Sequence, residues 1–377
     1  MKSKKISNPF PVTAYYGKDY FCDRVAETST LISNMQNGVS TTLISIRRIG
    51  KTGLIQHVLA SMPVGWKGIY VDILDTENLN QFLNKIATSI LAAIPEKSKP
   101  GKKIWNFFKS LRPVISFDPL SGSPQVSFDM KQRDVESGIM SVFDILEDQD
   151  FRVLIAIDEF QQILSYPEGS VDAWLRSKIQ LMKNVHFVFS GSQQHLMADL
   201  FASPARPFFR STQIMKLQKI DKEMYRNFII SLFRKGNKEM SPEIANAILE
   251  WAEIHTFYVQ QLCNRVYAVT EKKVSDDLWK TQAFGLLKEQ ETMFYAFRNI
   301  LTRSQWQLIR GIAQEGIVYQ PSSKAFINKH RLGSSASIHR SLGALLGYEL
   351  VYKDYDSSGK LYYSVYDVFF KRWCQDQ

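Results

Sequence analysis

The sequence predicts an α/β protein in three parts: a parallel sheet core, a helical segment and a C-terminal winged helix-turn-helix. Short apolar strands alternate with helix-like segments over residues 1–215, a pattern typical of a parallel sheet covered by helices. Strand-like runs then stop, and residues 216–292 contain only helix-like segments. Residues 293–377 contain three helix-like segments and then two short strands, the order expected of a winged helix. We therefore expect three domains with these bounds.

In the core, β-branched and aromatic runs predict four buried strands, over residues 41–46, 68–74, 151–157 and 185–190. Apolar side chains at helical spacing predict helices over residues 54–62, 78–94 and 135–147. Residues 95–126 break this alternation, because they are rich in Lys, Pro, Gly and Ser. We expect them to form an insertion with a helical turn and a short hairpin.

The second domain and the helices of the third are predicted from helical periodicity. Helices of the second domain are expected over residues 222–235, 242–255, 258–269 and 276–294. In the third domain, helices are expected over residues 302–315, 322–330 and 334–346, with strands over 350–353 and 361–365. Thr302 is the expected N-cap of the first of these helices.

A segment with the sequence SIRRIGKTG follows the first strand and precedes the first helix. A phosphate-binding loop takes this place, because its backbone N–H groups and the helix N-terminus together attract anionic phosphates. Lys51 is then expected to reach the β- and γ-phosphates, and the Thr52 hydroxyl to coordinate Mg²⁺. The expected nucleotide-binding residues are Ser45, Ile46, Arg47, Arg48, Ile49, Gly50, Lys51, Thr52 and Gly53. Alone, so short a pattern also fits an ordinary turn with an exposed lysine.

A hydrophobic strand that ends in two carboxylates, VLIAIDE, strengthens this interpretation. Asp158 is expected to hold the Mg²⁺ shell, and Glu159 to orient or activate the attacking water. The order along the chain, GKT first and then the acidic strand, is that of a nucleoside triphosphatase. Two acids at a helix start also occur for structural reasons, because the helix dipole favours them there.

Three further polar residues are candidates for the same site. Ser192 follows the strand over residues 185–190, and its hydroxyl could sense the γ-phosphate or simply belong to a turn. Arg206 and Arg210 are candidates for a cation that reaches the γ-phosphate in cis or in trans, and each could equally be a surface arginine. We take Lys51, Glu159, Ser192 and Arg210 as the predicted catalytic set.

With these motifs, the chain resembles the prokaryotic P-loop ATPases of the archaeal-ATPase type, within the STAND/AAA+ grouping. The resemblance covers nearly the whole chain and includes the segments NPF, YFCDR, SIRRIGKTGLI, VLIAIDEFQQI, VFSGSQQHLM, PFFRSTQIMKL, FYVQQL and VYDVFFKRW. It implies a P-loop NTPase core that is AAA+-like, a helical lid and a winged helix, with ATP and Mg²⁺ as cofactors. It also implies that Phe21 and Arg24 lie near the nucleotide base, and that the chain acts as a nucleotide-driven switch.

Four positions depart from the family pattern. Ser45 replaces the first loop glycine, Ile46 replaces a proline, Val25 replaces a glutamate, and residues 255–257 (HTF) replace a Gly-His-Pro-like turn. None removes Lys51 or the two acids, so we expect ATP binding and slow hydrolysis. The alternatives are a nucleotide-binding adaptor with little hydrolysis and a DNA-binding regulatory ATPase.

The formal net charge of +10 points to two basic surfaces. Residues 95–112 carry six basic and one acidic side chain, and residues 293–377 carry 11 basic and six acidic. DNA or an acidic protein partner is therefore expected at the winged helix or at the insertion. In the insertion, aromatic side chains interleave with Lys97, Lys99, Lys102, Lys103, Lys109 and Arg112. Trp105, Phe107 and Phe108 could stack on bases, rest on a membrane or pack on their own domain.

The remaining expectations concern location and assembly. The basic N-terminus has no apolar segment behind it, and no apolar run reaches the length of a membrane span. We expect a cytoplasmic protein without a transmembrane segment. An arginine that acts across subunits would require a homo-oligomer, which the sequence leaves open.

Overall fold

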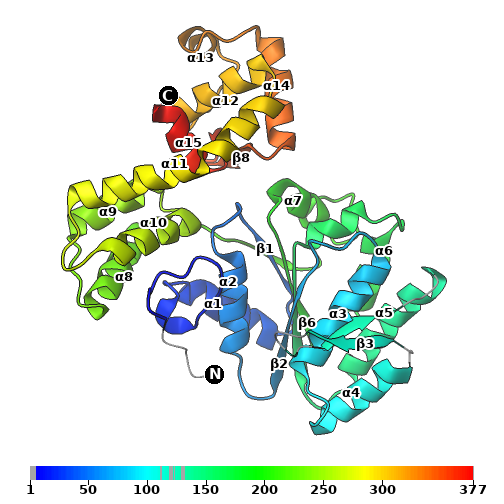
Figure 1. Cartoon of the computed structure of the whole chain (residues 1–377). Coiled ribbons are helices and arrows are strands. Elements are labelled where there is room, and N and C mark those ends of the chain that lie inside the picture. Colours follow the sequence, from blue (N-terminus) through cyan, green and yellow to red (C-terminus); the bar gives the residue numbers. More distant parts are fainter. Residues whose placement is uncertain (1–5, 111–112, 119–121, 123, 129–131, 377) are drawn as a thin grey trace. The chain divides into compact units, whose positions relative to one another are not determined.

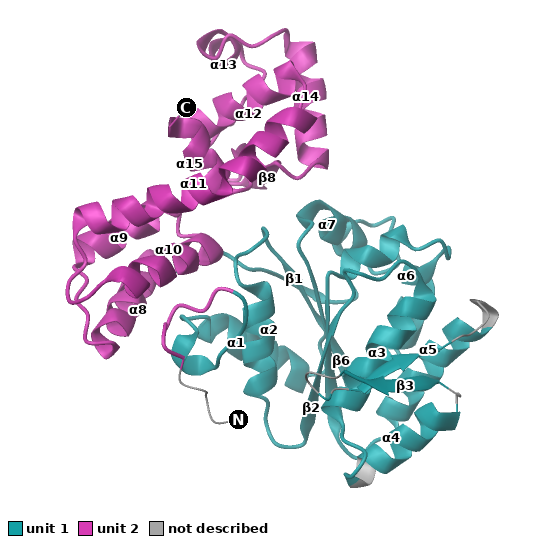
Figure 2. Ribbon diagram, viewed as in Figure 1, with its two compact units in different colours: residues 1–5, 13–220 teal, residues 6–12, 221–377 magenta. Residues whose placement is uncertain are grey.

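The computed structural model describes residues 6–110, 113–118, 122, 124–128 and 132–376 of the chain. It divides into two compact units (Figures 1 and 2). Unit 1 comprises residues 1–5 and 13–220, and unit 2 comprises residues 6–12 and 221–377. In the described residues, no helix is both long enough and apolar enough to cross a membrane.

Unit 1 is built on a five-stranded parallel sheet of order β2-β5-β6-β1-β7. The strands are β1 (Thr41–Ile44), β2 (Trp66–Asp72), β5 (Arg152–Asp158), β6 (Val185–Gly191) and β7 (Gln213–Lys216). The four predicted strands are confirmed to within three residues at each end. The fifth, β7, was not expected, because it is a short edge strand with mostly exposed side chains and carries no strong apolar pattern.

Both faces of the sheet are buried, which explains its continuous apolar strands. In β5, Val153 and Ile155 face one hydrophobic cluster, and Leu154 and Ala156 face the other. The second cluster also includes side chains of α1 (Val25–Gln36) and α2 (Lys51–Ala60). The first includes side chains of α3 (Leu79–Ala93), α4 (Lys99–Ser110), α5 (Gln132–Glu147), α6 (Val171–Ile179) and α7 (Gln194–Ala202). The predicted parallel sheet with helices on both faces is confirmed.

The insertion consists of α4 and a two-stranded antiparallel hairpin of β3 (Val114–Phe117) and β4 (Pro124–Ser127). The expected hairpin is present, and the expected helical turn is a helix of 12 residues. Trp105 and Phe108 are buried in the core, and the Trp105 indole N–H donates to the carbonyl oxygen of Ile94 at 3.0 Å. Of the three possibilities for these aromatic side chains, packing on their own domain is therefore correct for both. Phe107 packs, partly buried, against the same cluster.

The basic side chains of the insertion are partly neutralised. Lys103 forms an ion pair with Asp148 at 2.5 Å, and Lys109 forms one with Glu96 at 2.6 Å. Arg112 lies outside the described residues, as does the side chain of Lys99. Base stacking by Trp105 and Phe108 is therefore not supported, because both side chains are buried and two of the lysines around them are already paired.

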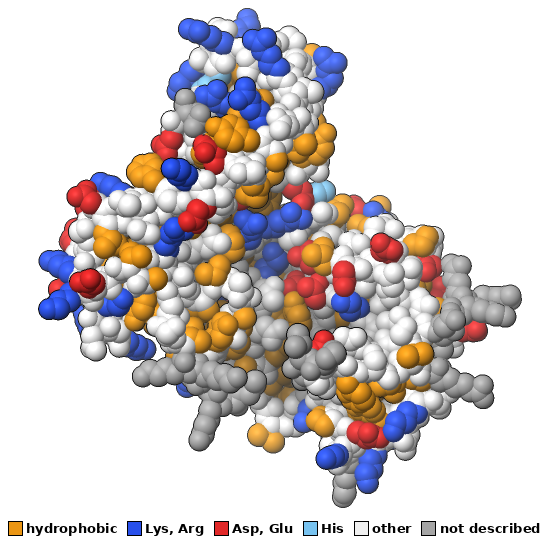
Figure 3. Space-filling model, in the orientation of Figure 1, with side chains coloured by type: hydrophobic (Ala, Val, Ile, Leu, Met, Phe, Trp, Pro, Cys, Tyr) orange, Lys and Arg blue, Asp and Glu red, His pale blue; other side chains and the backbone are white. Residues whose placement is uncertain are grey.

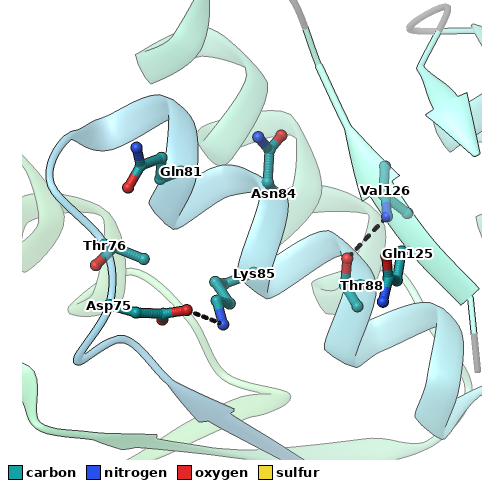
Figure 4. A pocket seen from close by; sticks show the side chains of 8 residues that line it. All are labelled: Asp75, Thr76, Gln81, Asn84, Lys85, Thr88, Gln125 and Val126. Atoms are coloured by element: carbon teal, nitrogen blue, oxygen red, sulfur yellow. Dashed lines mark hydrogen bonds and ion pairs between the residues drawn. The ribbon is translucent and has the colours of Figure 1, made fainter. Parts of the chain in front are cut away.

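A polar hollow of about 530 Å³ lies between α3 and β4 (Figure 4). Its lining side chains already hold the structure together. Thr88 Oγ1 accepts a hydrogen bond from the backbone N–H of Val126 at 3.0 Å, and Lys85 pairs with Asp75 at 2.8 Å. Asn84 Oδ1 accepts from the backbone N–H of Phe128 at 2.9 Å. These bonds satisfy backbone donors on the outer edge of β4, so we interpret the hollow as structural.

Unit 2 contains the lid helices α8 (Lys222–Lys235), α9 (Pro242–Trp251), α10 (Thr256–Val269) and α11 (Asp276–Ile300). The winged helix follows as α12 (Arg303–Glu315), α13 (Lys324–Lys329), α14 (Ser335–Gly347), β8 (Val351–Tyr355), β9 (Leu361–Val365) and α15 (Val368–Asp376). Polar N-caps fix several helix starts. Thr302 is the N-cap of α12, as the sequence predicts, and it also forms a capping box with Gln305. The bound expected between residues 292 and 293 lies inside α11, so lid and winged helix share one continuous helix.

The start of the described chain belongs to unit 2 rather than to the sheet domain. Phe10 is fully buried, with its ring 5.3 Å from that of Phe233 and 5.9 Å from that of Tyr267. Asn8 Nδ2 donates to the carbonyl oxygen of Asn264 at 2.8 Å, and Asn264 Nδ2 donates to that of Phe10 at 2.7 Å. These reciprocal bonds anchor residues 6–12 on α8 and α10.

The C-terminal helix α15 fastens the winged helix to the turn between α9 and α10. Lys371 is 3% exposed and pairs with Glu253 of this turn at 2.6 Å. Arg372 donates to the carbonyl oxygens of Trp251 at 2.8 Å and Glu250 at 3.0 Å. The ring of Phe369 also lies 4.7 Å from that of Tyr258 in α10. Lid and winged helix are therefore held together by buried polar and aromatic contacts.

We expect Lys371→Met to destabilise the protein by about 3 kcal/mol, because it leaves the partly buried Glu253 carboxylate without its cation. The midpoint of urea unfolding measures this effect. Lys329→Met is the matched control: Lys329 pairs with Glu315 at 2.6 Å but is 66% exposed, so its loss should cost less than about 1 kcal/mol. Equal midpoints for the two variants would contradict a buried latch at α15.

Candidate nucleotide site

The phosphate-loop motif lies between β1 and α2, at the carboxyl end of the sheet. Arg48 and Gly50 take positive φ values of 62° and 101°, which turn the backbone back toward the start of α2 at Lys51. Gly50 adopts this conformation without the steric cost of a side chain. The predicted loop geometry is therefore compatible with backbone N–H groups and a helix N-terminus that face a bound anion.

Lys51 is folded back into the loop and is 6% exposed. Its Nζ atom lies 3.3 Å from Ser45 Oγ and 3.4 Å from the carbonyl oxygen of Ile46. Burial lowers the pKa of Lys51, and the charges of Asp158 and Glu159 oppose this shift only in part. A phosphate in the loop would supply the negative charge that this buried ammonium group needs.

Asp158 lies at the end of β5. In the sheet, β6 separates β5 from β1, yet Asp158 still contacts the residue that follows Lys51. Thr52 Oγ1 donates to Asp158 Oδ2 at 2.7 Å, and Ser190 of β6 donates to Asp158 Oδ1. The Thr52 hydroxyl and the Asp158 carboxylate are hard oxygen donors, the kind that Mg²⁺ prefers. The donor set therefore fits the expected metal, with Thr52 and Asp158 as the residues that would hold it.

Glu159 follows Asp158 with a positive φ of 57° and is held by three hydrogen bonds. Its Oε2 atom accepts from the backbone N–H of Ser192 at 3.1 Å, from Ser192 Oγ at 2.8 Å and from Gln161 Nε2 at 2.6 Å. Arg47 Nε of the loop donates to Ser192 Oγ at 3.2 Å. A chain of polar contacts thus runs from the phosphate loop through Ser192 to Glu159. Gln161 was missed by sequence reasoning, although it lies in the segment DEFQQ.

Phe21 and Arg24 both lie against the loop and α2. The Phe21 ring stacks on His57 of α2 with centroids 4.4 Å apart and 16° between the ring planes. Arg24 is 3% exposed, pairs with Glu27 at 2.7 Å and donates to the carbonyl oxygen of Ile49 at 3.4 Å. Arg24 thus contacts the loop and Phe21 contacts α2, whereas their place near the nucleotide base stays a prediction. His57 joins them as a residue that the sequence did not single out.

The two candidate arginines do not join this cluster. Arg206 pairs with Asp199 at 2.6 Å. Arg210 lies just before β7 and lines a hollow with Gly38 and His186, which precede or begin parallel strands. It therefore sits at the amino edge of the sheet, whereas the phosphate loop sits at the carboxyl edge. Within one chain Arg210 is too far away to act on the nucleotide, so the cis role is wrong and only a role across subunits stays as a prediction.

The comparison with family models agrees with this geometry. Residues 21–261 match the model of the ATPase domain predominantly from Archaea. The chain belongs to this ATPase family. Residues 292–376 match a second model, described as a probable winged helix domain. The predicted family, the ATPase activity, and the fold of a P-loop core with a C-terminal winged helix are therefore confirmed.

Solved structures share the fold at low sequence identity. A Walker-type ATPase of Pyrococcus abyssi aligns with a TM-score of 0.66 at 14% identity, over 97% of this ATPase and 99% of that chain. The ORC2 protein of Aeropyrum pernix, solved as ADPNP-ADP complexes, aligns with a TM-score of 0.61 at 13% identity, over 98% and 95%. The ORC1 protein of the same organism, solved in complex with DNA, aligns with a TM-score of 0.52 at 14% identity. The alignment covers 98% of this ATPase and 96% of that chain. No curated protein matches the chain significantly.

Proposed function

We propose that this chain is a Mg²⁺-dependent, slowly hydrolysing ATP switch whose nucleotide state is communicated to a partner through unit 2. The observation that carries the proposal is the position of Glu159. Its carboxylate is fixed by Ser192 and Gln161 beside the Asp158–Thr52 pair. A carboxylate held next to a metal-binding pair and a phosphate loop is placed to activate water for attack on a phosphoryl group.

Each residue has a distinct task in this proposal. The loop backbone and Lys51 bind the phosphates of ATP, and Thr52 and Asp158 hold the cation. When bound, Mg²⁺ supplies positive charge that offsets the charge of the phosphoryl oxygens. Glu159 orients the attacking water and accepts its proton.

Arg47 and Ser192 offer a link between loop occupancy and the glutamate. Arg47 Nε donates to Ser192 Oγ, which itself donates to Glu159. A phosphate in the loop competes for the Arg47 guanidinium, because a cationic donor binds an anionic phosphate more strongly than a neutral hydroxyl. The bond from Arg47 to Ser192 then weakens when nucleotide binds, which changes the hydrogen bonding of Glu159 in response to loop occupancy.

Unit 2 is suited to carry the output of such a switch. The lid and the winged helix share α11, and α15 fastens the winged helix to the α9–α10 turn through Lys371 and Arg372. A movement of the lid is therefore passed directly to the winged helix, because a continuous helix rather than a flexible linker joins the two. The nucleotide-bound ORC2 structures support ATP as the ligand by analogy of fold.

The switch is tested by the hydrodynamic radius of the purified protein, measured by analytical ultracentrifugation with Mg²⁺ and either ATP or ADP. The Glu159→Gln variant is used, so that ATP persists during the run. We expect a sedimentation coefficient that differs between the two nucleotides. Identical values, together with normal binding of both, would favour the alternative of a nucleotide-binding adaptor over a switch.

DNA binding by the winged helix is the second candidate function. Basic side chains gather on the exposed face of α12, α13 and α14 (Figure 3). The exposed cations from α12 to β9 are Arg303, Lys324, Lys329, Arg331, Arg340, Lys353 and Lys360. In α14, the expected recognition helix, His339 and Arg340 are exposed, whereas Ile338 and Leu342 are buried. The DNA-bound ORC1 structure supports this candidate by analogy of fold.

We expect duplex DNA to bind at about 50 mM salt with an affinity that falls as salt rises, because phosphate contacts release counterions. Arg340→Ala should then reduce the slope of log affinity against log salt by about one. Fluorescence anisotropy of a labelled duplex measures both. Lys280→Ala, which removes one exposed charge from the lid, is the control and should leave the slope unchanged. Absence of binding at low salt would eliminate this candidate.

A further inference from the structure

A tyrosine hydroxyl from the edge strand of the sheet contacts the metal-binding carboxylate. Tyr70 of β2 donates to Asp158 Oδ2 at 3.0 Å, the same oxygen atom to which Thr52 Oγ1 donates at 2.7 Å. The other oxygen, Oδ1, accepts from Ser190 Oγ and from the backbone N–H of Glu159, the latter at 3.1 Å. Each carboxylate oxygen therefore has two donors, and the orientation of Asp158 is fully determined by the protein.

The sheet register explains how Tyr70 reaches this site. β2 and β5 are parallel neighbours in which Tyr70 is opposite Ala156 and Asp72 is opposite Asp158. The small side chain of Ala156 leaves room for the phenol ring, which extends two residues along the strand to the carboxylate. The ring packs, partly buried, against the cluster formed with α1 and α2.

We propose that Tyr70 is a positioning residue for the divalent cation, which it serves by orienting Asp158. This inference rests on the proposed Mg²⁺-dependent ATP site. Thr52 can donate its proton to Asp158 and still present an oxygen lone pair to the cation. The bond to Asp158 thus orients the Thr52 hydroxyl, and the bond from Tyr70 orients the Asp158 carboxylate. Because Tyr70 acts through its bond to Asp158, we expect its loss to change cation affinity rather than nucleotide contacts.

Hydrogen-bond partners of metal-ligating groups typically contribute 10- to 100-fold in metal affinity. Asp158 keeps its bonds to Thr52 and Ser190 when Tyr70 is lost, so the lower end of this range applies. For Tyr70→Phe we expect a roughly tenfold increase in the Mg²⁺ concentration that gives half-maximal tight nucleotide binding. Nucleotide affinity in excess EDTA should remain that of the wild type, because the loop and Lys51 are unchanged.

The test is a Mg²⁺ titration of fluorescent ATP-analogue binding to the full chain, with Mn²⁺ bound in the ternary complex counted separately by electron paramagnetic resonance. Tyr166→Phe is the matched control. Tyr166 is a buried tyrosine of unit 1, and its hydroxyl lies 2.6 Å from Thr76 Oγ1. The control should show wild-type Mg²⁺ and Mn²⁺ affinities, and thermal melts of both variants verify their folds.

Three outcomes are distinguishable. A Mg²⁺ shift in Tyr70→Phe alone, with unchanged affinity in EDTA, supports the inference. An unchanged Mg²⁺ midpoint, or an equal shift in Tyr166→Phe, overturns it while the proposed ATP site stands. Failure of the wild-type chain to bind the nucleotide overturns the proposed function and this inference with it.

Discussion

Glu159→Gln is expected to reduce the turnover of ATP by at least about 100-fold while nucleotide binding stays within about twofold of the wild type. The substitution keeps the size of the side chain and an oxygen acceptor. The amide oxygen can take the bonds from Ser192 and Gln161 that Glu159 Oε2 accepts at 2.8 and 2.6 Å. What it removes is the basic carboxylate that receives a proton from water. Loss of general-base catalysis typically costs two to four powers of ten in rate.

Phosphate release under saturating ATP and Mg²⁺ measures turnover, and equilibrium binding of a fluorescent analogue measures affinity. Glu77→Gln is the control, because Glu77 is an exposed carboxylate of the same unit, and this variant should hydrolyse ATP at the wild-type rate. Undiminished turnover in Glu159→Gln would mean that another group activates the water. A fall in binding equal to the fall in rate would mean that Glu159 supports the loop rather than the reaction.

Lys51→Ala is expected to weaken ATP binding by about 100-fold, which corresponds to about 2.7 kcal/mol. Charge-assisted hydrogen bonds contribute about 1.5–3 kcal/mol each, and this ammonium group is the buried cation that faces the interior of the loop. Its present contacts are two long bonds of 3.3 and 3.4 Å, both to neutral oxygen atoms. A phosphate therefore gains much more from Lys51 than the loop itself does.

The thermal stability of Lys51→Ala separates lost binding from lost folding. Because burial already lowers the pKa of Lys51, its charge is an unfavourable feature of the nucleotide-free protein. The variant should therefore melt no earlier than the wild type without nucleotide, and ATP should raise the melting temperature of the wild type alone. Lys67→Ala, which removes an exposed lysine of β2, is the control and should bind ATP with the affinity of the wild type. Equal ATP stabilisation of the wild type and Lys51→Ala would contradict the assigned role.

The parts of the fold predicted best were those with a strong local signal. The buried strands β1, β2, β5 and β6 are continuous apolar runs, and the loop and acidic motifs lie at their carboxyl ends. Parallel pairing then brings Lys51, Thr52, Asp158 and Glu159 together, although about 105 residues separate the two motifs. The two motifs could be placed together without knowing the order of the strands, because the carboxyl ends of all parallel strands lie at one edge of the sheet.

What the sequence did not reveal depends on tertiary contacts. Tyr70 is one tyrosine in a hydrophobic strand, and only the register of β2 against β5 directs its hydroxyl to Asp158. The place of Arg210 at the amino edge of the sheet depends on β7, a strand that the sequence did not predict. Trp105 and Phe108 looked available for a ligand among lysines, but the amphipathic spacing of α4 turns them into the core. The place of Phe10 in unit 2 follows from packing more than 200 residues away in sequence.

Release of inorganic phosphate from ATP by the purified wild-type chain, with Mg²⁺ and with excess EDTA, tests the central claim most directly. The proposed site requires slow, repeated turnover with Mg²⁺ and none with EDTA, because Thr52 and Asp158 act through the cation. Binding of ATP without any phosphate release in Mg²⁺ would contradict a hydrolysing switch.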